Sequence, residues 1–336
     1  MLTDHSIMSR TGAQRIGFTL IELLVVVAII ALLIGVLLPA LGKARATAWQ
    51  AKGQATQKQL VTGMVAYGAG TNSSIPGPNT SGRALQAFDS NPDQLDRRSG
   101  IPVQSYDWMT LALDDSDLPA NRAERFYRVL NEYADPANRE RFVASQLLNA
   151  SADLTTVAND RGGMPAPSYF MPATFQWAGT TLGSGASTTQ FGQPEPEKQV
   201  AELPPGYVPR VDKVGQPSTK VAISDAFADV DNQELNTEIW VEVEADSYGA
   251  FSSSTPIKAE SKNFYGVDGE TSLNRKLAFR HGGRMNAAYW DGHAAPLTQP
   301  EAQNPRNWYP AGSIFRGQQA VEGATDFGFD AGDRID

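Results

Sequence analysis

One carboxylate stands alone in an uncharged stretch near the N-terminus. From Phe18 to Leu38 the sequence runs for 21 residues, and Glu22 is the one charged residue among them. A helix of that length spans roughly 31 Å, which matches the hydrocarbon core of one bilayer. A charge in hydrocarbon is costly, so such an acid either pairs with a cation or reaches the interface near the helix end, where the helix dipole favours it. We expect a single transmembrane helix with Glu22 as a candidate functional residue.

The residues around Glu22 carry a further pattern. A polar leader ends in Gly17, and Phe18 opens the segment F-T-L-I-E that leads into the apolar run. This arrangement resembles the processing site of bacterial type IV prepilins and type II secretion pseudopilins. The resemblance implies that a prepilin peptidase cleaves between Gly17 and Phe18 and N-methylates Phe18. It also implies that Glu22 assists assembly by neutralising the terminal amine of a neighbouring subunit.

An ordinary secretory signal or a retained signal anchor is the alternative for this stretch. A secretory signal has an apolar region of about 7–15 residues and a small-residue cleavage site. Here the run is longer, and the segment from Pro39 to Gly42 matches such a site poorly. A signal anchor accounts for the hydrophobicity but not for Gly17, Phe18 and Glu22 together. Pro39 also fits the pilin pattern, and we expect a kink or local melting of the helix there.

A second set of candidate chemistry lies near the C-terminus, at His281, Asp291 and His293. Histidine with a carboxylate can serve acid–base catalysis or zinc binding. The Asp-Gly pair at Asp291 predicts a hairpin turn between strands 286–290 and 293–297. At about 3.3 Å per residue, His281 and Asp291 then lie roughly 20 Å apart. We therefore expect turn chemistry at Asp291, a hydrogen bond from His281 to a loop, and neither a catalytic nor a metal site.

The same residues carry a second resemblance. His281 is followed by nine residues and then Asp291-Gly292. This spacing resembles the H-X9-DG signature of a large bacterial group of prepilin-type proteins, here over residues 277–298. Residues 217–227 are similar to a segment that those proteins also carry. The resemblance supplies no biochemical role for this region.

Two acidic clusters are candidates for calcium, although neither has the spacing of an EF-hand. A solvated charged face is the favoured interpretation of these acids, with calcium binding as the alternative, so no cofactor is expected. The clusters comprise Asp225, Asp229, Asp231 and Glu234, and the C-terminal Asp326, Asp330, Asp333 and Asp336.

Composition narrows the class of protein. The formal net charge of −9 argues against nucleic-acid binding, which favours a basic surface. The absence of cysteine excludes disulfides and thiolate chemistry. No Gly-rich phosphate loop or hydrolase motif is present. Thirty glycines and 21 prolines favour a loop-rich domain with β structure.

The elements that position these residues follow from periodicity. Between 43 and 70, apolar residues recur at three- and four-residue steps, which predicts that the transmembrane helix continues as an amphipathic helix and ends near Gly70. Residues 122–133 and 136–148 also show helical periodicity, 106–113 a short helix or strand, and 169–177 one or two short strands. Segments 219–225 and 238–243 are predicted strands. The tail after Pro300 reads as poorly packed.

The predicted organisation is a leader at 1–17, a transmembrane helix at 18–41, the soluble half of that helix at 42–70 and a globular domain at 71–336. The fold class is α+β, with a C-terminal antiparallel sheet. Lys43 and Arg45 make the far flank the more basic one, so the positive-inside rule alone keeps the domain inside. The prepilin resemblance implies instead a single-pass inner-membrane protein with its domain outside the cytoplasm.

We expect a structural subunit of a pilin-like filament or type II secretion pseudopilus, and not an enzyme. Its partners are the prepilin peptidase, other pilin or pseudopilin subunits and inner-membrane lipid, without nucleic acid. The alternative from another class is a monomeric, membrane-tethered binding protein, for example for glycans, or a hydrolase. Such a protein uses the prepilin signal only as an anchor.

Overall fold

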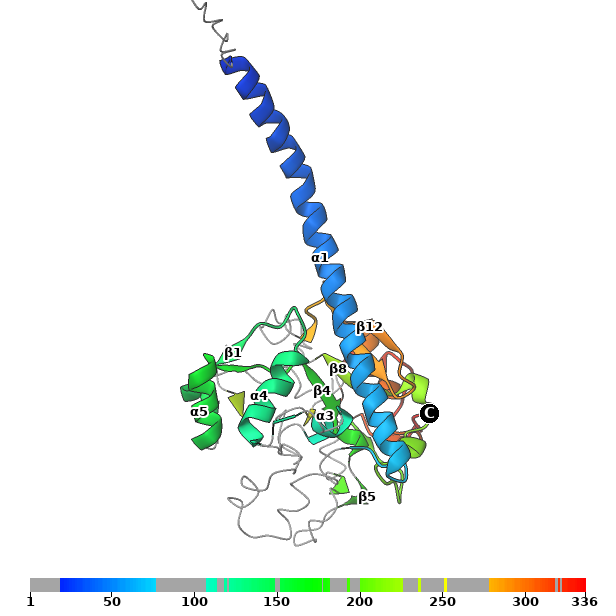
Figure 1. Ribbon diagram of the computed structural model, residues 1–336. Coiled ribbons are helices and arrows are strands. Elements are labelled where there is room, and N and C mark those ends of the chain that lie inside the picture. The colour runs from blue at the N-terminus through cyan, green and yellow to red at the C-terminus, as the bar shows by residue number, and fades with distance from the viewer. Residues whose placement is uncertain are drawn as a thin grey trace, which may run out of the picture. The chain divides into compact units, whose positions relative to one another are not determined.

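The computed structural model describes residues 19–76, 107–113, 118–119, 121–148, 152–176, 178–181, 192–193, 200–225, 235–236, 251–252, 278–317, 320 and 322–336 (Figure 1). The chain divides into two compact units, Met1–Ala46 and Thr47–Asp336. The fold is α+β, as the sequence predicts. The predicted strand 238–243 lies outside the described residues.

Helix α1 (Leu20–Gly70) is one continuous helix of 51 residues. The helix continues through Pro39, so of the kink or local melting expected there the melting is wrong, and the kink stays a prediction. Its apolar residues from Leu20 to Leu41 are exposed in the described chain. By length and composition α1 can cross a membrane.

The C-terminal end of α1 falls at Gly70, as the sequence predicts. The N–H of Ser73 donates to Gly68 O at 2.7 Å, and the N–H of Thr71 donates to the same oxygen at 3.1 Å. Asn72 and Ser73 have φ of +56° and +61°. This left-handed pair reverses the chain and satisfies a helix carbonyl that would otherwise lack a partner.

Within the second unit, the C-terminal part of α1 (residues 47–70) packs on the remaining elements through a narrow stripe. Leu60, Val61 and Met64 are fully buried on this stripe. At Gly63 a Cβ atom would lie 1.7 Å from the carbonyl oxygen of Ala112, in helix α3 (Asp107–Ala112). Glycine is therefore required for the close approach of these two helices.

A five-stranded sheet forms the centre of the second unit, in the order β10-β4-β8-β11-β12. The strands are β10 (Phe251–Ser252), β4 (Tyr169–Pro172), β8 (Val221–Asp225), β11 (Arg284–Tyr289) and β12 (Ala294–Thr298). β4, β8, β11 and β12 pair antiparallel, and β10 pairs parallel to β4. All five residues of β8 are buried, which fits its central place and its apolar start, Val221 to Ile223.

The predicted hairpin is confirmed, and Ala288 of β11 lies opposite Ala294 of β12. Its loop has three residues, Trp290 to Gly292, where the sequence suggested a two-residue turn. The N–H of Tyr289 donates to His293 O at 2.9 Å, and the N–H of Gly292 donates to Tyr289 O at 2.8 Å. Gly292 has φ of +87°, which is the glycine position of a three-residue hairpin loop.

Helices α4 (Arg122–Glu132) and α5 (Ala152–Arg161) pack on one another beside β3 (Met164–Pro165) (Figure 1). Asn121 caps α4, because its side chain accepts a hydrogen bond from the N–H of Glu124 at 3.0 Å. The helix predicted over 136–148 is wrong. That segment holds β1 (Arg141–Phe142), a short 3₁₀ turn (Ala144–Gln146) and β2 (Leu147–Leu148).

The tail after Pro300 is packed, so the expectation of a poorly packed tail is wrong. Phe315 and Ile335 are buried, and the N–H of Ile335 donates to Ser313 O at 2.8 Å. The remaining described elements are short. They are α8 (Gln299–Ala302), α9 (Glu322–Thr325), and the paired strands β5 (Ala178–Thr181) with β6 (Gly192–Gln193), β7 (Ala201–Glu202) with β13 (Ile314–Phe315), and β2 with β9 (Leu235–Asn236).

Candidate functional site

The first candidate site is the start of α1. Gly17 and Phe18 lie outside the described residues, whereas Glu22 lies inside. Glu22 Oε2 accepts hydrogen bonds from the N–H and the hydroxyl of Thr19, each at 2.8 Å. In return, Thr19 Oγ1 accepts from the N–H of Glu22 at 3.2 Å. This reciprocal pair is a capping box, so the carboxylate helps to begin the helix that carries it.

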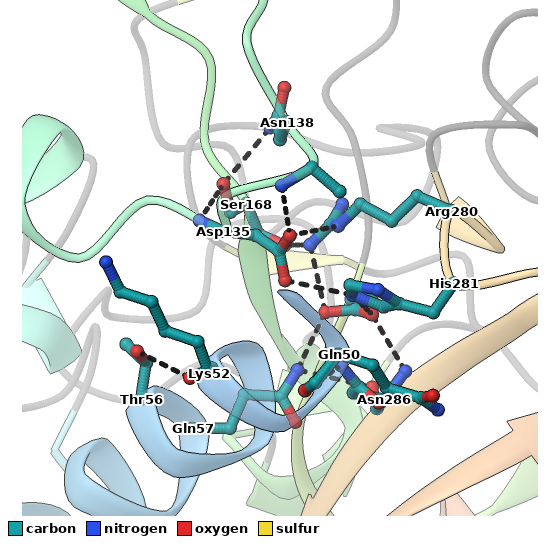
Figure 2. A network of polar contacts seen from close by, with 12 residues as sticks. Gln50, Lys52, Thr56, Gln57, Asp135, Asn138, Ser168, Arg280, His281 and Asn286 are labelled. Carbon is teal, nitrogen blue, oxygen red and sulfur yellow. Dashed lines mark hydrogen bonds and ion pairs between the residues drawn. The ribbon is translucent and has the colours of Figure 1, made fainter. Parts of the chain in front are cut away.

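The second candidate site is a buried polar cluster in the second unit (Figure 2). Its ionisable members are Asp135, Asp225, Arg280 and His281, and no side chain among them is more than 3% exposed. Asp135 follows helix α4, Asp225 ends strand β8, and Arg280 and His281 precede strand β11. The fold therefore brings together three segments that are distant in sequence.

His281 lies between the two carboxylates. Its Nε2 is 3.0 Å from Asp135 Oδ2 and 3.4 Å from Asp225 Oδ2. The N–H of His281 donates to Arg284 O at 3.2 Å, which fixes the turn that carries the ring. The ring nitrogen thus faces two oxygens that come from different elements.

Arg280 contacts the other oxygen of each aspartate. Its Nη2 donates to Asp225 Oδ1 at 2.9 Å and to the carbonyl oxygen of Ser168 at 2.6 Å. Its Nε lies 3.4 Å from Asp135 Oδ1. The guanidinium also lies over the Tyr169 ring, 5.9 Å from the centroid. One buried cation therefore bridges the two buried acids.

Uncharged donors complete the surroundings of Asp225. Gln57 of α1 donates from Nε2 to Asp225 Oδ1 at 2.8 Å. The N–H of Asn286 in β11 donates to Asp225 Oδ2 at 2.7 Å. Gln54 Nε2 donates to Asn286 Oδ1 at 3.1 Å. The C-terminal part of α1 is thus attached by amide side chains to strands β8 and β11.

A separate set of bonds holds Asp135. Its Oδ1 accepts from the N–H of Ala137 at 2.8 Å, and its own N–H donates to Ser168 Oγ at 3.0 Å. Asn138 Nδ2 donates to the same Ser168 oxygen at 3.1 Å. The loop after α4 is therefore tied to the segment that enters β4, and the carboxylate cannot turn away freely.

The pKa values of the two carboxyl groups are shifted in opposite directions. Burial raises the pKa of Asp225 to about 6, against the opposing effect of the Arg280 charge. Burial also disfavours the charged form of Asp135. There the hydrogen bond from His281 and the Arg280 charge outweigh burial, so the pKa of Asp135 falls below its usual value. Asp135 is thus the more acidic of the two aspartates.

Lys220 is a buried cation away from this cluster. Its Nζ donates to the main-chain oxygens of Arg306 at 2.9 Å and of Asp336 at 2.6 Å. Burial, together with the Arg306 charge, lowers the pKa of Lys220 to about 8. This lysine joins the start of β8 to the C-terminal tail.

The structure separates the candidates that the sequence grouped at the hairpin. Asp291 and His293 contact each other at the exposed loop, with 2.6 Å between Asp291 Oδ1 and His293 Nδ1. The His293 ring stacks on Tyr289 with the centroids 4.2 Å apart. His281 lies before β11, whereas Asp291 follows it, and the partner of His281 is the loop residue Asp135.

Of the residues considered for calcium, Asp225 belongs to the buried cluster, while Asp229, Asp231 and Glu234 lie outside the described residues. Within the described part of the chain, the only His and acidic side chains spaced for a metal ion are Asp135, Asp225 and His281. Among the described residues, the C-terminal aspartates are not gathered into such a group and offer no candidate calcium site.

Sequence reasoning missed Asp135, Arg280 and Gln57. One signal was available, because Gln57 is a polar residue within the buried stripe of α1, three positions before Leu60. A polar side chain at such a position needs a buried partner. Neither Asp135 nor Arg280 carries a comparable signal, since their pairing depends on the tertiary fold.

Comparison with known proteins gives one finding at the N-terminus. Residues 13–38 match the family model described as the prokaryotic N-terminal methylation motif. The matched residues include Gly17, Phe18 and Glu22, and they extend into the apolar part of α1. No curated protein and no solved structure matches the chain. The chain therefore carries a prepilin-type N-terminal motif followed by an apolar helix that can anchor it in a membrane.

Proposed function

We propose that the chain is a pilin-like or pseudopilin-like subunit that is processed at Gly17 and assembles through its N-terminal helix. The observation that carries this proposal is the methylation motif at residues 13–38, followed by an unbroken helix over Leu20–Gly70. The motif supplies a cleavage and methylation site, and the exposed apolar helix supplies a surface for lateral packing. In this role the chain is the substrate of a prepilin peptidase and not itself an enzyme.

Glu22 is the proposed assembly residue. Its two recorded side-chain bonds both use Oε2 and both come from Thr19 of the same helix. A carboxylate has room for several donors, so it can cap its own helix and also receive the terminal amine of a neighbouring subunit. The pairing would place two opposite charges together in the apolar phase, where each alone is costly.

The globular domain is proposed to lie outside the cytoplasm, in a periplasmic or surface filament or secretion pseudopilus. Cleavage after a short cytoplasmic leader supports this orientation, whereas the basic residues at 43–58 do not. The H-X9-DG resemblance at residues 277–298 also supports it, since it relates the far end of the chain to the same class of exported proteins.

N-terminal sequencing and intact mass, on protein purified from the native membrane, test the proposal. We expect a chain that begins at methylated Phe18. A Gly17→Val variant should keep its leader, whereas Gly12→Val, in the same leader, should be processed normally. An intact leader in the wild type, or a cut near Ala40, would overturn the assembly role.

A further inference from the structure

The two buried aspartates use their oxygens in the same way. Each turns Oδ1 toward Arg280, at 2.9 Å for Asp225 and 3.4 Å for Asp135. Each turns Oδ2 toward His281 Nε2, at 3.4 Å and 3.0 Å respectively. The Oδ1 atoms thus have a permanent cation, while the two Oδ2 atoms and the ring nitrogen converge on a common centre.

The spacing of these three atoms suits a small metal ion. Zinc binds nitrogen and carboxylate oxygen at about 2.0–2.2 Å in tetrahedral sites, which places neighbouring ligand atoms about 3.3 Å apart. The two measured separations of 3.0 and 3.4 Å bracket that value. All three ligand atoms lie within 4.8 Å of one another. A ring N–H, by contrast, points along one line and serves one of the two oxygens well.

We propose that Asp135 Oδ2, Asp225 Oδ2 and His281 Nε2 bind one divalent cation of the zinc type. This site is independent of the assembly role proposed for the N-terminal helix. Its donor set of one imidazole and two carboxylates is one that zinc accepts. All three side chains are at most 2% exposed, so the ion lies inside the domain and its role is structural.

The groups around the cluster hold the ligands as the outer shell of a metal site does. Asp225 Oδ1 accepts from Gln57 at 2.8 Å, and Asp135 Oδ1 accepts from the N–H of Ala137 at 2.8 Å. Both bonds are made by Oδ1, so each Oδ2 atom faces the centre. Asp225 Oδ2 also accepts from the N–H of Asn286 at 2.7 Å, which leaves it one further lone pair. The orientation of both carboxylates is therefore set by the fold before any ion arrives.

Gly53 lets the backbone of α1 approach one of the ligand atoms closely. A Cβ atom there would lie 2.4 Å from Asp135 Oδ2 and 3.0 Å from Asn286 Nδ2. A side chain at this position would therefore displace Asp135 Oδ2 from its place in the cluster.

The charges are compatible with this occupant. Two carboxylates and one guanidinium sum to one negative charge in a buried place, which favours a further cation there. A divalent ion and a ring proton on His281 are the two candidates, and metal analysis distinguishes them.

Metal analysis of the full-length chain in detergent micelles, purified with a tag that lacks histidine, tests the site. We expect about one zinc per chain. A chelator should lower the unfolding midpoint, and added Zn²⁺ should restore it in a concentration-dependent way, because an ion that binds only the folded state stabilises it. After chelation, Co²⁺ should give the visible absorption of a tetrahedral complex.

Variants locate the ion. His281→Gln keeps a hydrogen-bond donor beside Asp135 but removes the imidazole, and we expect at least about tenfold weaker Co²⁺ binding. Asp135→Asn should behave similarly. His293→Gln is the matched control, because His293 pairs with Asp291 at an exposed loop of the same hairpin. It should bind Co²⁺ as the wild type does.

Three outcomes would overturn the proposal. One is a wild-type chain with zinc at background level, no cobalt absorption and no response to the chelator. This result would mean that a hydrogen bond from the His281 ring, without a metal ion, joins the ring to the carboxylates. Another is unchanged Co²⁺ affinity in His281→Gln, which places the ion elsewhere. The third is loss of binding in His293→Gln alone. The chelator measurement uses the wild type, so it tests metal binding even if the variants do not fold.

Discussion

His281 Nε2 lies 3.0 Å from Asp135 Oδ2, although 146 positions separate the two residues. The contact joins the loop after α4 to the segment that enters β11, beside the C-terminal part of α1. Arg280 and Asp225 extend it to strand β8. The cluster thus fixes the mutual position of a helix, a loop and two central strands.

Removal of one acid from this cluster should be strongly destabilising. Asp225→Ala deprives Arg280, Gln57 and the Asn286 N–H of their acceptor. Loss of one partner of a buried ion pair costs about 3–5 kcal/mol. We expect a decrease of that size in the unfolding free energy, measured by urea denaturation of the full chain in detergent.

The matched control for that change is Asp212→Ala. Asp212 pairs with Arg210 at 2.8 Å, but both side chains are exposed by about a third or more. Exposed ion pairs contribute about 0–1 kcal/mol. Equal effects of the two substitutions would contradict a stabilising role for the buried cluster.

Gly53 and Gly70 offer a matched pair of substitutions in one helix. Gly53→Ala places a methyl group 2.4 Å from Asp135 Oδ2, so helix or carboxylate must shift, at a cost of about 1–3 kcal/mol. At Gly70 a Cβ atom meets nothing within 4 Å, and Gly70→Ala should change stability by less than about 0.5 kcal/mol. Thermal unfolding of both variants checks the difference, and similar midpoints would show that α1 does not need this close approach.

Lys220 predicts a pH dependence of stability. Burial lowers the pKa of Lys220 to about 8 in the folded chain, from an ordinary value of 10.5. Between these values the unfolded chain binds more protons than the folded one, so this residue's contribution to stability rises with pH. Relative to Lys220→Met, the wild type should gain about 2 kcal/mol between pH 7 and pH 9.5.

Denaturation series at several pH values measure this gain. The upper limit of pH 9.5 avoids an opposite effect of the buried tyrosines. Burial raises the pKa of these tyrosines in the folded chain, so stability falls once tyrosine in the unfolded chain ionises near pH 10. Lys213→Met, at an exposed position nearby, should keep the wild-type slope. Parallel pH profiles for the wild type and Lys220→Met would refute the prediction.

Glu22 can be tested by two substitutions that separate helix capping from charge. Glutamine at the third helical position also completes a capping box, so Glu22→Gln retains the bonds from Thr19 and loses only the charge. Glu22→Ala loses both. We expect both variants to be cleaved after Gly17 but to fail to enter filaments, as measured by cross-linking of neighbouring subunits in the membrane. Normal incorporation of Glu22→Gln would assign the role to capping instead of charge pairing.

The sequence predicted those parts of the fold that depend on interactions between neighbouring residues. The end of α1 follows from Gly68 to Ser73, and the hairpin follows from Asp291-Gly292, because turn chemistry is a property of neighbouring residues. The helix expected over 136–148 failed for a physical reason. Asp135 Oδ1 accepts from the N–H of Ala137, and Asn138 Oδ1 accepts from the N–H of Glu140 at 3.3 Å. These side-chain bonds compete with helix formation.

The buried cluster could not be predicted as a unit. His281 and Asp225 were both noticed, but each was grouped with acids near it in sequence. Their true partner, Asp135, comes from a loop about 90 residues before Asp225. The pairing of β8 with β11 brings Asp225 to His281, and the bond of Asp135 to Ser168, just before β4, brings the third residue to them. Periodicity carries no information about such contacts.

The packed tail sets an order of events in the synthesis of this chain. Ile335 is fully buried, its N–H donates to Ser313 O, and its carbonyl oxygen accepts from the N–H of Gly312 at 2.7 Å. The domain therefore reaches its final packing only after residue 335 has left the ribosome. Helix α1 emerges some 300 residues earlier, so the apolar anchor is available for membrane insertion while the domain that follows it is still incomplete.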